Sequence, residues 1–112
     1  MATSNEAPSL LPGTLDLLIL KTLTRGPMHG YAIADHLRTV SDDILQVGES
    51  SLYPALQRLL LNDWVTAEWG ASENNRRARF YKLTAAGRKQ LRMERDEFER
   101  LIGAIHKVLQ TT

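Results

Sequence analysis

The chain has 112 residues, no cysteine and a formal net charge of +1 at neutral pH. One domain with a single core fits this length, and the missing cysteines exclude disulfides and thiolate metal sites. Because no apolar run is long enough to cross a bilayer and the first residues lack a secretion signal, we expect a soluble cytoplasmic protein without a membrane partner.

Residues 1–9 are polar or small, so they are predicted to form a flexible tail. A first helix is predicted from Thr14 to the Arg25-Gly26-Pro27 stretch, where glycine can cap the helix and proline cannot continue it. Its apolar residues follow helical spacing on two sides, which indicates a helix buried between neighbours. They are Leu15, Leu18, Ile19 and Leu23 on one side, with Leu17 and Leu20 on the other.

A second, shorter helix is predicted over residues 31–40, after His29 and Gly30. Its expected inward residues are Ile33, Ala34, Leu37 and Val40. The following Ser-Asp-Asp run is typical of a helix end. Residues 44–47 then link this helix to the next one.

A third helix carries one apolar stripe and one unusual polar face. Leu52, Ala55, Leu56, Leu59 and Leu60 have the spacing of a buried stripe. The opposite face holds Ser50, Tyr53, Pro54, Gln57 and Arg58, which is typical of a surface that reads a partner. We expect the helix to begin near Ser50, with Ser50 or Ser51 as its cap. It should end at Asn62-Asp63, where such a residue can take a positive φ.

A hairpin with a basic tip is predicted next. Val65, Ala67 and Trp69 alternate with polar neighbours, residues 79–83 form a second alternating run, and residues 70–78 form the turn. Residues 76–92 contain seven lysines or arginines and no acidic residue, whereas residues 1–75 contain four basic and nine acidic residues. This clustering favours a polyanionic partner, although a basic run is often only a solvated face.

Thr84 is the expected N-cap of a last helix over residues 85–109. At 1.5 Å per residue this helix would be roughly 40 Å long, which overhangs a domain of this size. Its apolar seam comprises Leu91, Phe98, Leu101, Ile105 and Val108, widened by Ile102 and Leu109. We expect a second copy of the chain to cover this seam. The alternative is a monomer in which the last helix folds back on the first.

Two short helices joined by a loop, the second with a reading face, and a basic hairpin are the parts of a winged helix-turn-helix. The predicted fold is therefore mainly α with a small β-hairpin. We expect residues 10–83 to form a winged helix-turn-helix DNA-binding domain and residues 84–112 to form a long C-terminal dimerisation helix.

Three segments resemble the PadR family of bacterial transcriptional regulators: GPMHGYAIADHL (26–37), SSLYPALQRL (50–59) and RRARFYKLTAAG (76–87). The resemblance implies a homodimeric repressor that binds an inverted-repeat operator in double-stranded DNA. One recognition helix would enter the major groove of each half-site, and the hairpin would approach the backbone or minor groove. The short length is similar to the compact branch of the family, in which some members bind planar aromatic effectors at the dimer interface.

The residues expected to touch DNA precede the second helix, line the third helix and occupy the hairpin. Gln57 suits adenine, Arg58 suits guanine or phosphate, and the hairpin arginines suit phosphate. The full set is His29, Tyr31, Ser50, Ser51, Tyr53, Pro54, Gln57, Arg58, Arg76, Arg77, Arg79 and Lys82. The expected dimer interface is Leu15, Leu18, Leu91, Phe98, Leu101, Ile102, Ile105, Val108 and Leu109. The resemblance places the aromatic effector at Phe98 and Leu101.

Several residues have two possible structural or functional roles. Tyr31 and Tyr81 can each place the ring in the core and the hydroxyl near phosphate, and Tyr81 is predicted to be a core residue. Trp64 and Trp69 are predicted to pack rather than to stack on a ligand. Glu49, acidic and close to the DNA side, would repel phosphate unless it caps the third helix or accepts a hydrogen bond from a cytosine amine.

Two other classes of protein must be weighed. The sequence offers little for an enzyme, because His29, His36 and His106 lack metal-ligand spacing and no triad or phosphate loop is present. No catalytic residue, metal site or cofactor is therefore predicted. The closer rival is a winged helix that docks onto a protein instead of DNA. The hairpin arginines argue against it, since such a module has no evident need to keep them free of carboxylates.

Overall fold

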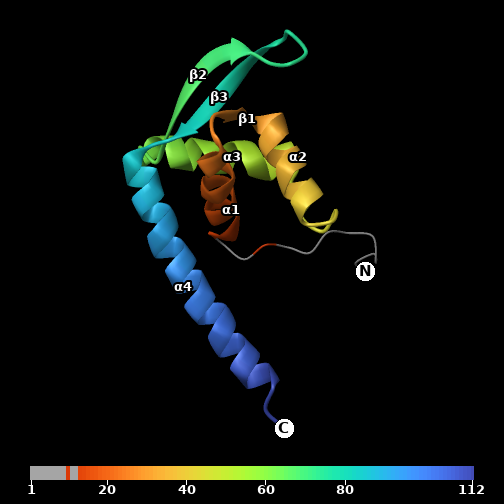
Figure 1. The fold of residues 1–112 in the computed structure, drawn as a ribbon, viewed down its shortest axis with the longest axis vertical. Coiled ribbons are helices and arrows are strands. Elements are labelled where there is room, and N and C mark those ends of the chain that lie inside the picture. The colour runs from red at the N-terminus through yellow and green to blue at the C-terminus, as the bar shows by residue number, and fades with distance from the viewer. Residues whose placement is uncertain (1–9, 11–12) are drawn as a thin grey trace.

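The computed structural model describes residue 10 and residues 13–112, and the predicted tail of residues 1–9 lies outside the described residues. Its elements are α1 (Thr14–Thr22), the 3-10 turn η1 (Leu23–Arg25), β1 (Met28–His29), α2 (Gly30–Val40), α3 (Glu49–Leu61), β2 (Val65–Ala71), β3 (Arg77–Leu83) and α4 (Ala85–Leu109). Figure 1 shows α1, α2 and α3 gathered below the sheet, with α4 leading away from them. The predicted fold class, mainly helical with a small antiparallel sheet and a long last helix, is confirmed.

The sheet has three antiparallel strands in the order β1-β3-β2. The sequence predicted only the two long strands, and both extend further toward the connecting turn than expected. The short strand β1 was missed because two residues carry no alternation. It forms because Met28 and His29 lie beside Tyr81 and Phe80 of β3. The long hairpin of β2 and β3, residues 65–83, is called the wing below.

The start of α3 differs from its predicted form. The helix begins at Glu49 and its N-cap is Gly48, without a side-chain cap hydrogen bond. The expected cap by Ser50 or Ser51 is therefore wrong, because both serines lie inside the first helical turn. At the other end, Asp63 takes the predicted positive φ, at 59°.

The core lies where α1 meets α2, α3 and the base of the wing. As expected for a helix that is apolar on two sides, α1 contacts α2, α3 and α4. The core residues are Leu17, Ile19, Leu20, Leu23, Ile33, Leu37, Leu52, Ala55, Leu56, Leu59, Val65, Tyr81, Leu83 and Leu91. Val40, predicted to face inward, is 62% exposed because it stands in the last turn of α2, beyond the part that packs on the core.

The first turn of α4 is joined closely to the base of the wing. Thr84 is the N-cap, as predicted, and its hydroxyl oxygen accepts a hydrogen bond from the Gly87 N–H at 2.9 Å. The same hydroxyl donates to the Asp63 carbonyl at 2.7 Å. A Cβ added at Gly87 would collide with the Trp64 carbonyl oxygen, so a glycine is required for this close approach.

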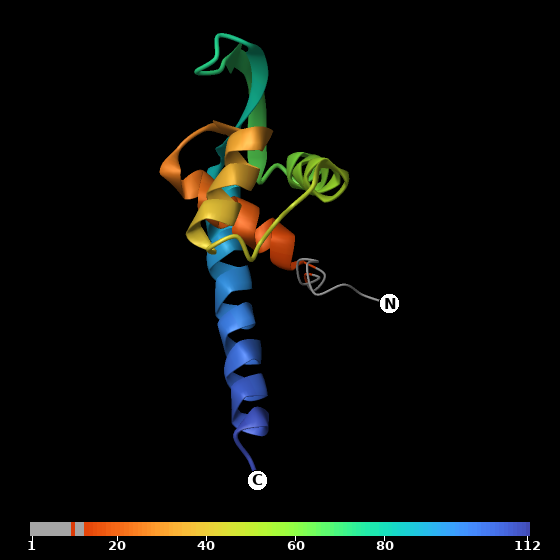
Figure 2. The same cartoon turned by 90° about the vertical axis from the view of Figure 1, so that its right-hand side faces the viewer.

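Only the first half of α4 packs on the domain. Leu91 is buried and Phe98 is partly buried against the core. Beyond them α4 runs clear of the other elements in both views (Figures 1 and 2), which accounts for a longest dimension of 56 Å. Residues 99–109 are called the free half of α4. Within the described part of the chain, no helix combines the length and apolarity that a membrane span needs.

Candidate nucleic-acid interface

The outer face of α3 is open to solvent. Because Leu52, Ala55, Leu56 and Leu59 turn inward, the side chains between them point outward. All six predicted contact residues of this helix are exposed: Ser50, Ser51, Tyr53, Pro54, Gln57 and Arg58. Glu49, Tyr53 and Gln57 are spaced by four residues, so they form one row along the face.

The wing lies beside α3. The face of the sheet that packs on the core at the base of the wing extends past the core toward the tip. Leu83 and Tyr81 are buried, and the next two residues of β3 with the same orientation are Arg79 and Arg77. Trp69 lies opposite Arg79 on β2. One continuous face of the sheet is therefore apolar at its base and becomes basic and aromatic toward its tip.

These side chains border a groove between the wing and the first turns of α2 and α3, called the wing groove. It has a volume of about 380 Å³, and its walls include Tyr31, Tyr53, Trp69, Tyr81, Arg77 and Arg79. The guanidinium carbon of Arg77 lies 4.8 Å from the centre of the Trp69 ring, and that of Arg79 lies 5.9 Å from the Tyr81 ring. The rings thus hold both cations against the groove wall.

The aromatic residues of the wing groove differ in burial. Tyr81 is buried, as predicted, and burial raises the pKa of its hydroxyl. Tyr31 is 75% exposed and Trp69 is 61% exposed. The prediction that Trp64 packs is confirmed, because it lies partly buried against the core. The same prediction is wrong for Trp69, which stands on β2 beyond the point where the strand leaves the core.

Two predicted basic contacts do not line the wing groove. Lys82 follows Tyr81 on β3, so it points to the opposite face of the wing. Arg76 lies in the loop between the strands with its side chain exposed. The Arg76 N–H donates to the Ser72 hydroxyl at 3.3 Å, and the Arg76 carbonyl accepts from the Ser72 N–H at 2.8 Å. The tip of the wing is therefore held by hydrogen bonds between the Arg76 backbone and both the backbone and the side chain of Ser72.

The Arg58 side chain forms an ion pair within the protein, with Asp16 of α1. Its Nη2 donates to Asp16 Oδ1 at 2.7 Å and its Nε donates to Asp16 Oδ2 at 3.4 Å, which joins α3 to α1. The hydrogen bond to Asp16 raises the pKa of the Arg58 guanidinium. The contact with guanine or phosphate that the sequence suggested would have to compete with this ion pair.

His29 has a different role from the predicted DNA contact. It is 8% exposed, and its Nδ1 caps α2 by accepting a hydrogen bond from the Ala32 N–H at 3.2 Å. Its Nε2 lies 3.5 Å from Glu73 Oε2 in the wing loop, and its ring packs edge-on against Phe80. The Glu73 carboxylate accepts a hydrogen bond from the Glu73 backbone and one from His29, and both lower the pKa of Glu73. His29 therefore links α2 to the wing.

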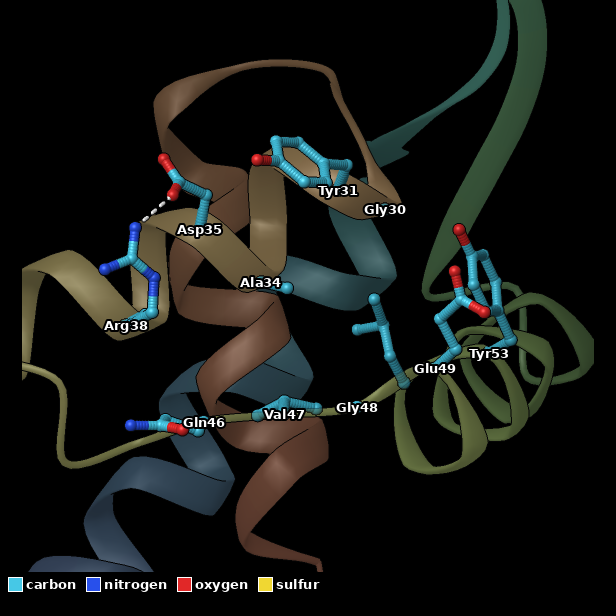
Figure 3. A pocket seen from close by; sticks show the side chains of 11 residues that line it. Gly30, Tyr31, Ala34, Asp35, Arg38, Gln46, Val47, Gly48, Glu49 and Tyr53 are labelled. Carbon is cyan, nitrogen blue, oxygen red and sulfur yellow. Dashed lines mark hydrogen bonds and ion pairs between the residues drawn. The ribbon is translucent and has the colours of Figure 1, made fainter. Parts of the chain in front are cut away.

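A second groove separates α2 from the start of α3 and is called the helix groove. Its volume is about 550 Å³, and its polar walls include Tyr31, Asp35, Arg38, Gln46, Glu49 and Tyr53. Figure 3 shows Asp35 and Arg38 paired on one wall, with Glu49 beside Tyr53 on the other. Arg38 lies 2.6 Å from Asp35 and 2.9 Å from Asp43, so its charge is already compensated.

The predicted dimer residues fall into two groups. Leu91 is buried, and Leu15, Leu18 and Phe98 are partly buried against the chain's own core. Leu91 is thus a core residue and not an interface residue, because the first half of α4 lies along α1. In the free half, Leu101, Ile105, Val108 and Leu109 are exposed and Ile102 is partly exposed.

The predicted effector residues, Phe98 and Leu101, border a cleft between α4 and the start of α1. The cleft has a volume of about 260 Å³ and is also lined by Leu17, Glu94 and Glu97. For metal binding, the described residues include no group of three or more His, Cys, Asp or Glu side chains that could hold an ion.

Residues 19–93 match the model of the "Transcriptional regulator PadR-like family". The chain belongs to the PadR-like family. Membership confirms the resemblance seen in the sequence and implies DNA binding and transcription regulation rather than catalysis. It also disfavours the protein-docking alternative.

Solved structures of PadR-like and other transcriptional regulators are similar to this PadR-like chain. One from Clostridium thermocellum is 30% identical, with a TM-score of 0.78 over 85% of this chain and 92% of that one. A PadR family regulator from Eggerthella lenta is 28% identical, with a TM-score of 0.73 over 89% of this chain and 85% of that one. A PadR-like regulator from Bacillus cereus is 23% identical, with a TM-score of 0.76 over 89% and 95% of the two chains, and supports the fold alone.

Proposed function

We propose that the protein is a homodimeric repressor that binds an inverted-repeat operator. In each half-site α3 lies in the major groove, which is wide enough for a helix, and the wing lies along the neighbouring backbone. The observation that carries this proposal is that the exposed face of α3 and the wing arginines border one groove, through Tyr53 on one side and Arg77 and Arg79 on the other.

The contact residues divide by chemistry. Gln57 can bond both N6 and N7 of adenine in the major groove. Arg77 and Arg79 suit phosphate, as do the hydroxyls of Tyr31 and Tyr53 beside them. Ser50 and Ser51, in the first turn of α3, add hydroxyls that suit phosphate. The Ser51 N–H already donates to the Gly48 carbonyl at 3.1 Å.

The free half of α4 supports the homodimer. It exposes Leu101, Ile105, Val108 and Leu109, and a patch of this kind on a small domain marks an interaction surface. A two-fold axis at this helix would present two copies of α3 to two half-sites, about 34 Å apart on one face of the duplex. A palindromic operator follows from that symmetry.

The cleft beside Phe98 and Leu101 supports the proposal of a small planar aromatic effector. The cleft lies where α1 meets α4, so a ligand there could change the spacing of the two recognition helices and release the DNA. Because Glu94 and Glu97 line the cleft, a neutral or cationic ring should bind better than an anionic one.

The test is a gel shift of the full-length protein on the DNA upstream of its own gene, titrated with salt and with unrelated competitor DNA. We expect tight binding that weakens steeply with salt and survives the competitor. Absence of binding at low salt would contradict DNA binding by this chain. Binding that the competitor abolishes would show a DNA-binding protein whose operator lies elsewhere, and adding cationic or neutral aromatic compounds then tests release.

A further inference from the structure

The two grooves beside α3 carry opposite charge. They share a wall, because Gly30, Tyr31 and Tyr53 border both of them. The wing groove contains two arginines, whereas in the helix groove Arg38 is paired with Asp35 and Asp43. The Glu49 carboxylate takes part in none of the side-chain hydrogen bonds or ion pairs among the described residues. An uncompensated carboxylate therefore stands at the edge of a surface that must approach phosphates.

Helix capping does not explain why an uncompensated carboxylate stands at position 49. The N-cap of α3 is Gly48, and Glu49 is the first helical residue, with its side chain exposed. Its charge can interact favourably with the N-terminus of the helix. That interaction would be equally available to a carboxylate on a side of the helix away from the DNA.

The position of Glu49 matches that of a base-reading residue. In helix-turn-helix proteins the N-terminal residues of the recognition helix contact base edges. Glu49 begins the row that continues through Tyr53 and Gln57, and Figure 3 shows its side chain next to that of Tyr53 on the same wall of the helix groove. In the docking proposed above, with α3 in the major groove, a carboxylate in this row faces base edges.

The major-groove edges of the four bases differ in what they offer a carboxylate, which only accepts hydrogen bonds. Cytosine presents its N4 amine as a donor, and adenine presents the N6 amine beside the N7 acceptor, which repels a carboxylate. Guanine and thymine present acceptors and a methyl group. We propose that Glu49 selects a cytosine in each half-site. This inference rests on the proposed function, because it assigns one base of the operator to one side chain of α3.

The experiment selects bound sequences from a pool of random double-stranded DNA with the full-length protein and its variants. We expect the wild type to enrich cytosine at one position of each half-site, by roughly tenfold over the next base. Glu49→Ala should remove the preference at that position alone. Glu49→Gln should move it toward adenine, because an amide can bond both N6 and N7.

Asp42→Asn is the matched control. Asp42 is an exposed acid in the turn after α2, its φ of 52° suits asparagine, and the change removes the same charge as Glu49→Gln. It should leave the cytosine preference intact, and thermal unfolding checks that every variant is folded.

Two results would overturn the proposal in different ways. If Glu49→Gln enriches the same bases as the wild type and only tightens binding to all DNA, as Asp42→Asn would, Glu49 acts through its charge alone. If the wild type enriches no sequence, the proposed sequence-specific function fails first and Glu49 has no base to select.

Discussion

The wing groove and the free half of α4 are both exposed surfaces, yet they are made of opposite residue types. The wing groove combines arginines with aromatic rings, whereas the free half exposes leucine, isoleucine and valine. Charged and amphipathic groups are stable in contact with water when no polyanion is bound, because water solvates them well. An aliphatic surface gains most from permanent cover. The difference fits a transient partner for the wing groove and, as proposed above, a lasting partner for the free half of α4.

The two surfaces also differ in how they are supported. The wing is anchored by buried residues at its base, and it lies inside the segment that matches the family model, residues 19–93. The free half of α4 lies beyond that segment, and its ribbon runs away from the other elements in Figures 1 and 2; within it, Leu101 still borders the cleft with the start of α1. A second chain would supply the missing support.

The largest effect should come from placing charge on the free half. Leu101→Glu with Ile105→Glu should give monomers in sedimentation, because two carboxylates would be buried in the interface. The affinity for a two-half-site operator should fall by about 100-fold or more, since the linkage between the two sites is lost. Arg100→Glu with Lys107→Glu changes the opposite side of the same helix and should leave a dimer. A stable dimer of the first variant would refute the assigned interface.

Next in size is the removal of the arginines that line the wing groove. Arg77→Ala with Arg79→Ala removes four cations from a dimer, so the slope of log affinity against log salt should decrease by about 3 to 4. Lys82→Ala is the control, because Lys82 points to the other face of the wing and should change the slope little. An equal loss with Lys82→Ala would mean that the groove face does not meet the DNA.

The packing of the first turn of α4 against the base of the wing can be tested by measuring the free energy of unfolding. Gly87→Ala should lower the free energy of unfolding by about 2 kcal/mol or more, because the new methyl group overlaps the Trp64 carbonyl. Gly103→Ala, in the free half of the same helix, meets no atom within 4 Å in the chain and should raise it by about 0.5 to 1 kcal/mol. Denaturant unfolding at fixed protein concentration measures both. Equal effects would show that the close approach at Gly87 is not needed.

The smallest effect is expected at Arg58. Arg58→Ala breaks an ion pair in which the Arg58 side chain is half exposed but the Asp16 side chain is only 14% exposed, so stability should fall by about 1 to 2 kcal/mol. DNA affinity should change little, because the guanidinium is held by α1. A gel shift with the unmodified operator measures the affinity. Loss of binding comparable to that of the wing double variant would return Arg58 to the set of DNA contacts, as the sequence suggested.

Features that depend on neighbours along the chain could be predicted. The buried stripe of α3 and the exposed face opposite it follow from helical spacing, and the Thr84 cap and the positive φ of Asp63 follow from side-chain chemistry beside the backbone. The basic character of the wing was likewise visible as a run of arginines. These interactions are short in sequence, so a pattern of residues is enough to specify them.

Features that depend on distant segments could not be predicted. Arg58 was predicted as a DNA contact because its partner, Asp16, is 42 positions away, and His29 was predicted as one because Phe80 and Glu73 come from the wing. Trp69 looked like a packing residue because only the β2–β3 register shows where the sheet leaves the core.

The sequence by itself determined the order of helices α1 to α4 and of the long strands β2 and β3, the polar face of α3 and the length of α4. Each of these rests on periodicity and local hydrogen bonds. Only the tertiary structure decided which arginines face the wing groove, which half of the apolar seam is covered by α1, and where Glu49 stands relative to Tyr53. The reason is physical: burial and charge pairing depend on which segments meet, and segments far apart in the sequence meet only when the core forms.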